Sequence, residues 1–205
     1  YREKSHIVHL FSQEYGRVDG ILRQTPAPQY QPIRVQATGK SELKNFTQLE
    51  ILHQPVFFHG DAFFSWFYLN EIVLRLCPLE EALPQTFRQY QVTLLQLQQL
   101  ASHAQADLFL RQILRQFEHA LLQELGYAID FASDANQQSI QPLQHYQFQL
   151  NDGFMSVARE SKATLDGESI IAMQSYVAGQ DFTAVQLQLL AKLYRQMISS
   201  LLGDR

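Results

Sequence analysis

The segment that most constrains this chain is residues 60–78, which reads GDAFFSWFYLNEIVLRLCP. Asp61 can accept a hydrogen bond from a free N–H of a first helical turn, and Pro78 cannot continue a helix. A helix that is apolar nearly all round is buried from several sides, so we predict a central helix on which other elements pack. Glu71 and Arg75 fall inside a stretch already short for a bilayer, which disfavours a transmembrane helix.

Composition narrows the class of protein. The chain has 205 residues, of which 46% are hydrophobic, and this excludes a largely disordered protein. The length allows one sizeable domain, or a small domain attached to a larger one. The single cysteine, Cys77, cannot form an internal disulfide or supply a multi-cysteine zinc site, and we expect it to be buried at a helix end. Low cysteine content and no visible signal peptide predict a cytoplasmic protein.

Residues 1–55 predict β-structure. Strand candidates cover residues 6–11, 17–22, 30–38 and 42–52, and turn or loop signals rich in Gly or Pro separate them. Several short strands joined by tight turns predict a small antiparallel barrel.

Most of the remaining chain predicts helices. Beyond the central helix, apolar residues at a three-to-four spacing predict helices over residues 84–101, 105–125 and 183–202. Residues 127–158 are less regular, and Asp152-Gly153 between two apolar runs predicts a β-hairpin there. We therefore predict an α+β chain, with a barrel over residues 1–55 and a mainly helical domain over residues 60–205.

Charge is unevenly distributed along the chain. The net charge is −4, but residues 1–50 hold seven Lys/Arg against five Asp/Glu (+2), and the remainder holds nine against fifteen (−6). The N-terminal barrel is therefore the better candidate surface for a polyanion. A barrel can hold single-stranded nucleic acid by combining a basic groove with aromatic rings that stack on bases. The candidate DNA-binding residues are Arg2, Lys4, Arg17, Arg23, Arg34, Lys40, Lys44, Tyr15 and Tyr30. Scattered solvated charges and core aromatic rings are the alternative.

No motif indicates catalysis. The sequence contains no hydrolase elbow, phosphate-binding loop or glycine-rich dinucleotide fingerprint. Its seven histidines lack metal-binding spacing, and Glu80-Glu81 is typical of a solvated pair near a helix N-terminus rather than an acid–base pair. We predict a protein that is not an enzyme and has no cofactor or metal.

Several motifs, in order along the chain, resemble those of one family. Residues 67–76 (FYLNEIVLRL) are similar to its central helix, residues 10–18 (LFSQEYGRV) to a strand and turn, and residues 39–44 (GKSELK) to a hairpin. The closest match is residues 114–127 (LRQFEHALLQELGY), which resemble an L-R-x-F-E…L-L-x-x-L-G-Y helix. Together the motifs make the chain similar to the bacterial recombination mediators of the RecO family.

The resemblance implies an N-terminal OB-fold barrel followed by a helical domain. It implies a nucleoid-associated protein of DNA repair and recombination that binds single- and double-stranded DNA and anneals complementary strands. With RecR it would help load RecA onto DNA coated by single-stranded DNA-binding protein. Many members carry a four-cysteine zinc site after L-G-Y, but residues 128–153 contain no cysteine, so we expect the zinc-free type. The family's basic loop corresponds to residues 23–28, with one basic residue, and we expect its first strand to precede Tyr1.

The resemblance also implies a docking site on the helical domain for the acidic, hydrophobic tail of single-stranded DNA-binding protein. Such a tail needs an apolar groove with an arginine for its carboxylate. The candidate partner-binding residues are Arg75, Arg111, Arg115 and Phe117. Local pairing is the alternative for the arginines, for example Arg111 with Asp107 or Arg115 with Glu118. A second interpretation of the whole chain is a non-catalytic adaptor that binds protein partners through its helices without binding DNA.

Overall fold

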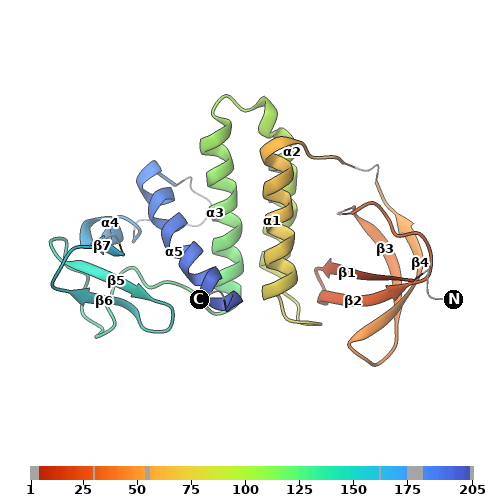
Figure 1. Ribbon diagram of the computed structural model, residues 1–205, viewed down its shortest axis with the longest axis horizontal. Coiled ribbons are helices and arrows are strands. Elements are labelled where there is room, and N and C mark those ends of the chain that lie inside the picture. The colour runs from red at the N-terminus through yellow and green to blue at the C-terminus, as the bar shows by residue number, and fades with distance from the viewer. Residues whose placement is uncertain (1–4, 30, 54–55, 162, 175–181, 204–205) are drawn as a thin grey trace. The chain divides into compact units, whose positions relative to one another are not determined.

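The computed structural model of this chain describes residues 5–29, 31–53, 56–161, 163–174 and 182–203. The chain forms two compact units, residues 1–98 and 99–205, and each combines strands with helices (Figure 1). It is thus an α+β protein, as predicted; the predicted domain boundary between residues 55 and 60 stays a prediction. Among the described residues, no helix is both long and apolar enough to cross a membrane.

The first unit begins with a four-stranded sheet. Its strands are β1 (His6–Ser12), β2 (Gly16–Leu22), β3 (Ile33–Thr38) and β4 (Leu43–Ile51), in the order β1-β2-β4-β3. Two pairings are antiparallel, but β2 and β4 run parallel, with Asp19 opposite Leu43. The predicted antiparallel barrel therefore needs a correction, because β4 lies beside β2 after the chain has first formed the outer strand β3. Within residues 5–53 as described, β1 and β3 are edge strands that are not paired with each other, so a closed barrel is not seen.

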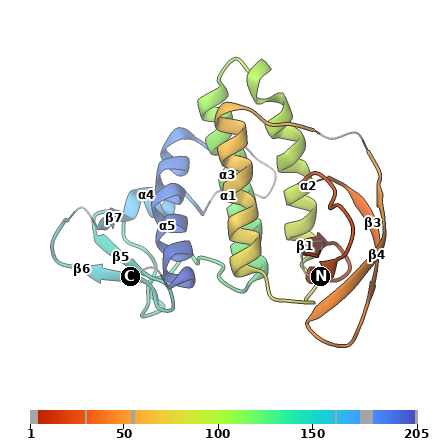
Figure 2. The same cartoon turned by 45° about the vertical axis from the view of Figure 1, so that its right-hand side comes forward.

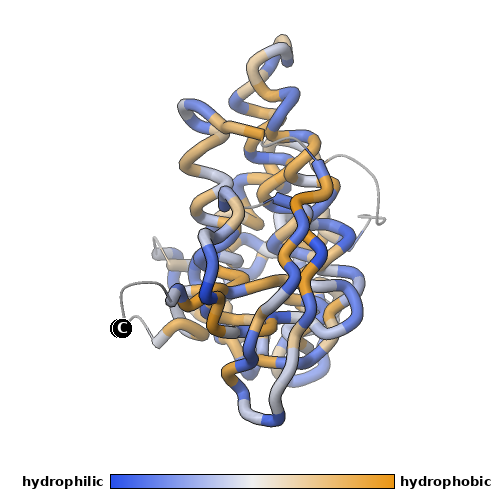
Figure 3. Tube along the Cα trace, turned by 90° about the vertical axis from the view of Figure 1, so that its right-hand side faces the viewer, coloured by the Kyte–Doolittle hydropathy of each residue, from blue (hydrophilic) through white to orange (hydrophobic). Residues whose placement is uncertain are grey.

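One face of this sheet carries a small core. Leu22 and Phe46 are 1% and 4% exposed. Gly20 lies beneath Phe46, and a Cβ at Gly20 would come within 2.5 Å of the Phe46 ring, so only glycine leaves room for the ring. Figure 3, in which the sheet faces the viewer, shows hydrophilic and hydrophobic positions alternating along its strands. The alternation fails in β4, because Gln48 has a φ of 53°, and the apolar side chain of Ile51 beyond it is 43% exposed.

Two helices complete the first unit. They are α1 (Gly60–Leu76) and α2 (Pro84–Gln99), and Tyr90 Oη of α2 donates a 2.7 Å hydrogen bond to Asn70 Oδ1 of α1. Both ends of α1 lie within two residues of the prediction, and its N-cap residue is His59 rather than Asp61. Cys77 follows its last turn and is 2% exposed, which confirms the expectation of a buried thiol at a helix end.

The prediction that α1 is buried on several sides is wrong on one side. Leu69, Ile72 and Val73 are buried, whereas Phe64 and Phe67 are 71% and 54% exposed. An apolar sequence all round a helix does not reveal which side remains open. Exposed phenylalanines in a row are unusual on a protein surface and mark a place where α1 contacts water through apolar rings.

In the second unit, as far as the structure describes it, three α-helices and one short 3-10 helix combine with a second sheet. Its elements are η1 (Leu100–Ser102), α3 (Ala106–Glu124), β5 (His145–Gln149), β6 (Gly153–Val157), β7 (Thr164–Asp166), α4 (Gly167–Ile171) and α5 (Ala184–Leu202). The sheet order is β6-β5-β7, so the predicted hairpin is present and gains a third strand that the sequence did not indicate. Figures 1 and 2 show α3 and α5 side by side. Thr183 and Gln186 form a capping box at the start of α5, and Gly203 ends it with a φ of 75°.

The loop that follows α3 is held by its own aspartates. Asp130 Oδ2 accepts a 2.6 Å hydrogen bond from Ser133 Oγ, and this bond, followed by one from the Ala132 N–H, lowers the pKa of Asp130. Asp134 Oδ1 accepts from the backbone N–H groups of Asn136 and Gln138, both at 2.9 Å. Over the part of the chain that the structure describes, no group of three or more His, Cys, Asp or Glu converges as a metal site would require.

Candidate nucleic-acid interface

The described DNA-binding candidates fall at two ends of the first sheet. Because β2 and β4 run parallel, both begin at the same end, and Tyr15 and Lys40 lie in the turns just before them. Arg23 and Arg34 lie at the opposite end, where β2 finishes and β3 begins. The other three candidates, Arg2, Lys4 and Tyr30, lie outside the described residues.

Four candidates are accessible to a ligand. Tyr15 is 66% exposed, and Arg23 and Lys40 are also exposed. The Arg34 side chain is 72% exposed and places Nη1 2.9 Å from Glu50 Oε2, on a side chain that is itself 60% exposed. An ion pair so open to water contributes little to stability, so Arg34 can exchange Glu50 for a phosphate at small cost.

Arg17 is a correction to the predicted site. Its side chain is only 18% exposed, and its guanidinium donates a hydrogen bond to the Leu74 carbonyl in the last turn of α1. Its Nε lies 3.4 Å from Asp19 Oδ1, an atom that is also 2.8 Å from His9 Nδ1. Because these contacts occupy the guanidinium inside the unit, the geometry contradicts a direct phosphate contact by Arg17.

Lys44 is a second correction. Its side chain is 13% exposed, and its Nζ lies 2.5 Å from Glu80 Oε1 and donates to the Ser41 carbonyl at 2.8 Å. Glu80 is therefore an ion-pair partner and not one of two merely solvated carboxylates. No sequence pattern indicates these contacts of Asp19 and Glu80, because they depend on which strands and loops meet in space.

The predicted partner-binding arginines are engaged in local ion pairs. Arg111 Nη2 lies 3.0 Å from Asp107 Oδ2, and Arg115 Nη2 lies 2.5 Å from Glu118 Oε1, so both arginines form the local pairs that helical spacing allows, and their role in partner binding stays a prediction. Arg75 Nη1 is 3.5 Å from Glu71 Oε1 one turn earlier. Accessibility separates the three, since the exposed fractions of Arg75, Arg111 and Arg115 are 42%, 67% and 15%.

Phe117 is a third correction. It is 0% exposed, so its ring belongs to the core and is not available to a partner. The sequence did hold a signal for this, because Ile113, Phe117 and Leu121 lie four residues apart on the apolar side of α3, and all three are fully buried.

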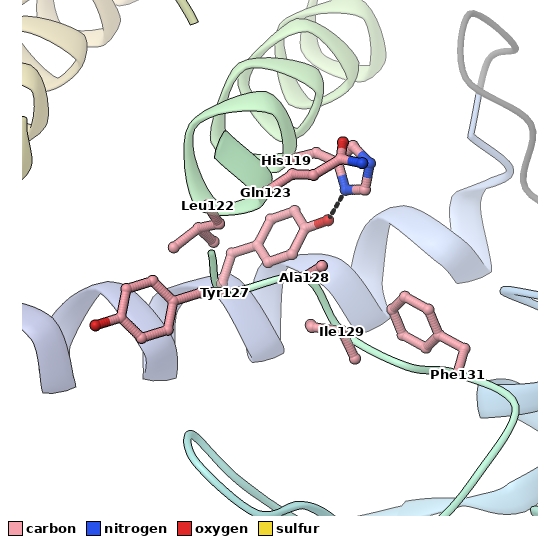
Figure 4. Close-up of a pocket in the computed structure, with 8 residues that line it drawn as sticks. His119, Leu122, Gln123, Tyr127, Ala128, Ile129 and Phe131 are labelled. Carbon is pink, nitrogen blue, oxygen red and sulfur yellow. Dashed lines mark hydrogen bonds between the residues drawn. The ribbon is translucent and has the colours of Figure 1, made fainter. Parts of the chain in front are cut away.

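A small cavity in the second unit was not predicted. Figure 4 shows residues from the end of α3 and from the loop after it around this cavity, among them His119, Tyr127 and Phe131. His119 Nδ1 is hydrogen-bonded to Tyr194 Oη at 2.6 Å, and burial lowers the pKa of His119. The cavity volume is about 10 Å³, which is room for one water molecule at most and too little for a peptide side chain.

Comparison with known proteins identifies the family. The family model described as "Recombination protein O C terminal" matches residues 59–197. The chain belongs to the RecO family. A DNA repair protein RecO of Pseudomonas putida (strain W619) is 34% identical, over 100% of this chain and 88% of its own. A DNA repair protein RecO of Cellvibrio japonicus is also 34% identical with the same coverage, and that of Tolumonas auensis is 33% identical over 100% of this chain and 86% of its own. The resemblance seen in the motifs is thereby confirmed.

Proposed function

We propose that this RecO protein is a DNA-binding recombination mediator in DNA repair. It binds single- and double-stranded DNA, anneals complementary strands, and with RecR helps load RecA onto single strands coated by single-stranded DNA-binding protein. The observation that carries the proposal is similarity over the whole chain to relatives named DNA repair protein RecO. Such a role requires no bond-breaking chemistry, so the protein need not be an enzyme, and it places the protein at the bacterial chromosome in the cytoplasm.

The proposal includes an OB-type barrel in the first unit. The strand order β1-β2-β4-β3, with one parallel pair between β2 and β4, leaves β1 and β3 as the two edges. One further strand that paired with both edges would close the sheet into a five-stranded barrel. Barrels of this type bind single strands on their strands and loops through cations and stacking rings.

We place the DNA contacts at the exposed candidates only. Arg23, Arg34 and Lys40 supply positive charge, and Tyr15, with two-thirds of its surface exposed, supplies a ring on which a base can stack. Each cation that meets a phosphate releases a counterion, so three such contacts predict a slope of about −2 for log K against log salt with single strands.

We propose Arg111 as the residue that takes the carboxylate of the single-stranded DNA-binding protein tail. It is the most exposed of the three arginines, and Leu108, one turn earlier on α3, is 42% exposed beside it. Its pair with Asp107 is open to water, with Asp107 79% exposed, so a second carboxylate can replace it.

A non-catalytic adaptor is the second candidate, and one observation favours it. Of the five described cations of the predicted DNA site, Arg17, Arg34 and Lys44 are each within 4 Å of a carboxylate of the same chain. This pairing lowers the positive charge that the sheet presents to DNA. An adaptor would bind protein partners through the helices and would leave DNA unbound.

The test is fluorescence anisotropy of a labelled single strand across a salt series, with the full-length protein. The mediator predicts binding that weakens log-linearly with salt, and a slope reduced by about 0.7 in each of Arg34→Ala and Lys40→Ala. Arg159→Ala removes one exposed cation from the second unit, at a residue with no proposed binding role, and serves as the matched control, with the slope unchanged. Absence of binding at low salt would refute the mediator and leave the adaptor.

A further inference from the structure

Three residues distant in sequence join the first sheet to the end of α1. The Arg17 side chain donates to the Leu74 carbonyl, and the Arg17 carbonyl accepts a 2.8 Å hydrogen bond from the Glu80 N–H. The last carbonyls of a helix lack partners within it, and a cation near them is favourable, so Arg17 satisfies the C-terminal end of α1 from outside the helix. Lys44, on β4, pairs with the Glu80 side chain. We call Arg17, Lys44 and Glu80 the lock.

Glu80 is held in a conformation that it would not adopt alone. Its φ is 58°, in the left-handed region that costs a non-glycine residue free energy. The Glu80 N–H is bound to the Arg17 carbonyl, and the Glu80 carboxylate is paired with Lys44. Two such contacts from the surrounding structure can hold a residue at an unfavourable backbone angle. Next to it, the Glu81 carbonyl oxygen lies so close to Gly16 that a Cβ at Gly16 would overlap it.

The lock reaches the hairpin that carries a proposed DNA contact. Lys44 Nζ donates to the Ser41 carbonyl at 2.8 Å, within the turn between β3 and β4. Lys40, the exposed cation proposed to meet a phosphate, is the residue before Ser41. Lys44 therefore connects Glu80 to the backbone of residues 39–42 and fixes how that turn is presented.

We infer that Arg17, Lys44 and Glu80 are positioning residues, which hold the residue 39–42 hairpin in place for DNA and do not themselves touch DNA. The inference rests on the proposed DNA-binding function and deepens it. For Lys44 to reach a phosphate, it would have to leave both Glu80 and the Ser41 carbonyl, from a side chain that is 13% exposed. The lock therefore contributes through the geometry of Lys40.

Glu80→Gln separates positioning from simple electrostatics by the sign of its effect. Removal of an acidic charge near a DNA site would tighten binding if charge alone mattered. Loss of the lock instead predicts that Kd for a labelled single strand rises about fivefold, roughly 1 kcal/mol. The matched control is Glu42→Gln, which makes the same charge change at an exposed residue of the same hairpin and predicts equal or tighter binding.

A charge swap tests whether Lys44 contacts DNA. Lys44→Gln should weaken binding with an unchanged salt slope, whereas Lys40→Ala should reduce the slope by about 0.7. The double variant Lys44→Glu with Glu80→Lys keeps the net charge and rebuilds the pair with reversed sign, while a carboxylate at position 44 cannot donate to the Ser41 carbonyl, so the swap should recover only part of the affinity that Lys44→Gln loses. The melting temperature of each variant is measured as well. A value well above the temperature of the binding assay verifies that binding is measured on folded protein.

Each outcome decides the inference. If the swap binds DNA as weakly as Lys44→Gln and both variants show a reduced salt slope, Lys44 contacts DNA directly and the inference is overturned. If Lys44→Gln and Glu80→Gln have lower melting temperatures but bind DNA normally, the lock only stabilises the fold, and the inference is also overturned. If wild-type protein does not bind DNA, the proposed function fails, and the DNA part of the inference fails with it. The melting temperature of the swap then tests the lock alone. The lock is refuted if that temperature is no higher than those of the two single variants.

Discussion

Gly16→Ala offers the sharpest test of how residues 79–82 dock on the sheet. Gly16 has a φ of 63°, and Gly60 has a nearly equal φ of 55° in the same unit. A Cβ at Gly16 would overlap the Glu81 carbonyl oxygen, whereas a Cβ at Gly60 would meet nothing within 4 Å. Gly60→Ala therefore carries only the cost of alanine in the left-handed region, about 1 kcal/mol.

Gly16→Ala carries that cost and two more. The Glu81 carbonyl belongs to the backbone and must move, which costs about 1–3 kcal/mol as overpacking does elsewhere. The movement also weakens the hydrogen bond from the Glu80 N–H to the Arg17 carbonyl, worth about 1 kcal/mol. The free energy of unfolding should thus fall by about 3–5 kcal/mol in Gly16→Ala, roughly 2–4 kcal/mol more than in Gly60→Ala.

Urea denaturation followed by tryptophan fluorescence measures both variants. The chain has one tryptophan, Trp66, which lies on α1 in the first unit, so its emission reports that unit. With a denaturant slope of about 1.5 kcal/mol per molar urea, the midpoint should drop by about 0.7 M in Gly60→Ala and by about 2–3 M in Gly16→Ala. Equal midpoints in the two variants would refute the close approach of residues 79–82 to β2.

Two further predictions concern the second unit and are followed by far-ultraviolet circular dichroism. Tyr146 is 1% exposed, and its hydroxyl accepts from the Gln141 N–H at 2.8 Å, so Tyr146→Phe should lower the free energy of unfolding by about 1–3 kcal/mol; a change under 0.5 kcal/mol would contradict that bond. Burial holds the pKa of His119 below its ordinary 6.5, so the unfolded chain binds a proton more readily, and His119 should destabilise the fold as pH falls below about 6.5. His119→Gln should melt with a weaker dependence on pH between 7.5 and 5.5, and an identical pH dependence would disprove the role of His119.

Local signals in the sequence were sufficient for most of the fold. Helix α1 was predicted to within two residues at each end, because Pro78 limits it and most of its side chains are apolar. The hairpin at Asp152-Gly153 and the ends of the helices predicted over residues 105–125 and 183–202 also follow from local signals, because Gly126, Gly153 and Gly203 lie at these turns and each has a positive φ. Such features depend on the conformation of a few neighbouring residues, which is what a sequence pattern records.

What could not be predicted depends on contacts between distant residues. Arg17 and Lys44 were expected to bind DNA because both are basic, yet their partners Leu74 and Glu80 lie more than 30 positions away along the chain. The parallel pairing of β2 with β4 likewise depends on where the β3–β4 hairpin docks. A count of charges cannot distinguish a cation that meets solvent from one that closes an internal contact.

The measurement that tests the central proposal most directly is the annealing of two complementary single strands coated by single-stranded DNA-binding protein, followed by fluorescence energy transfer between labels on the strands. A RecO-type mediator predicts that the full-length protein accelerates annealing over the coated strands alone. It also predicts that high salt and the double variant Arg34→Ala with Lys40→Ala both reduce the acceleration. Annealing at the same rate with and without the protein, under low-salt conditions in which the protein is folded, would contradict the proposal.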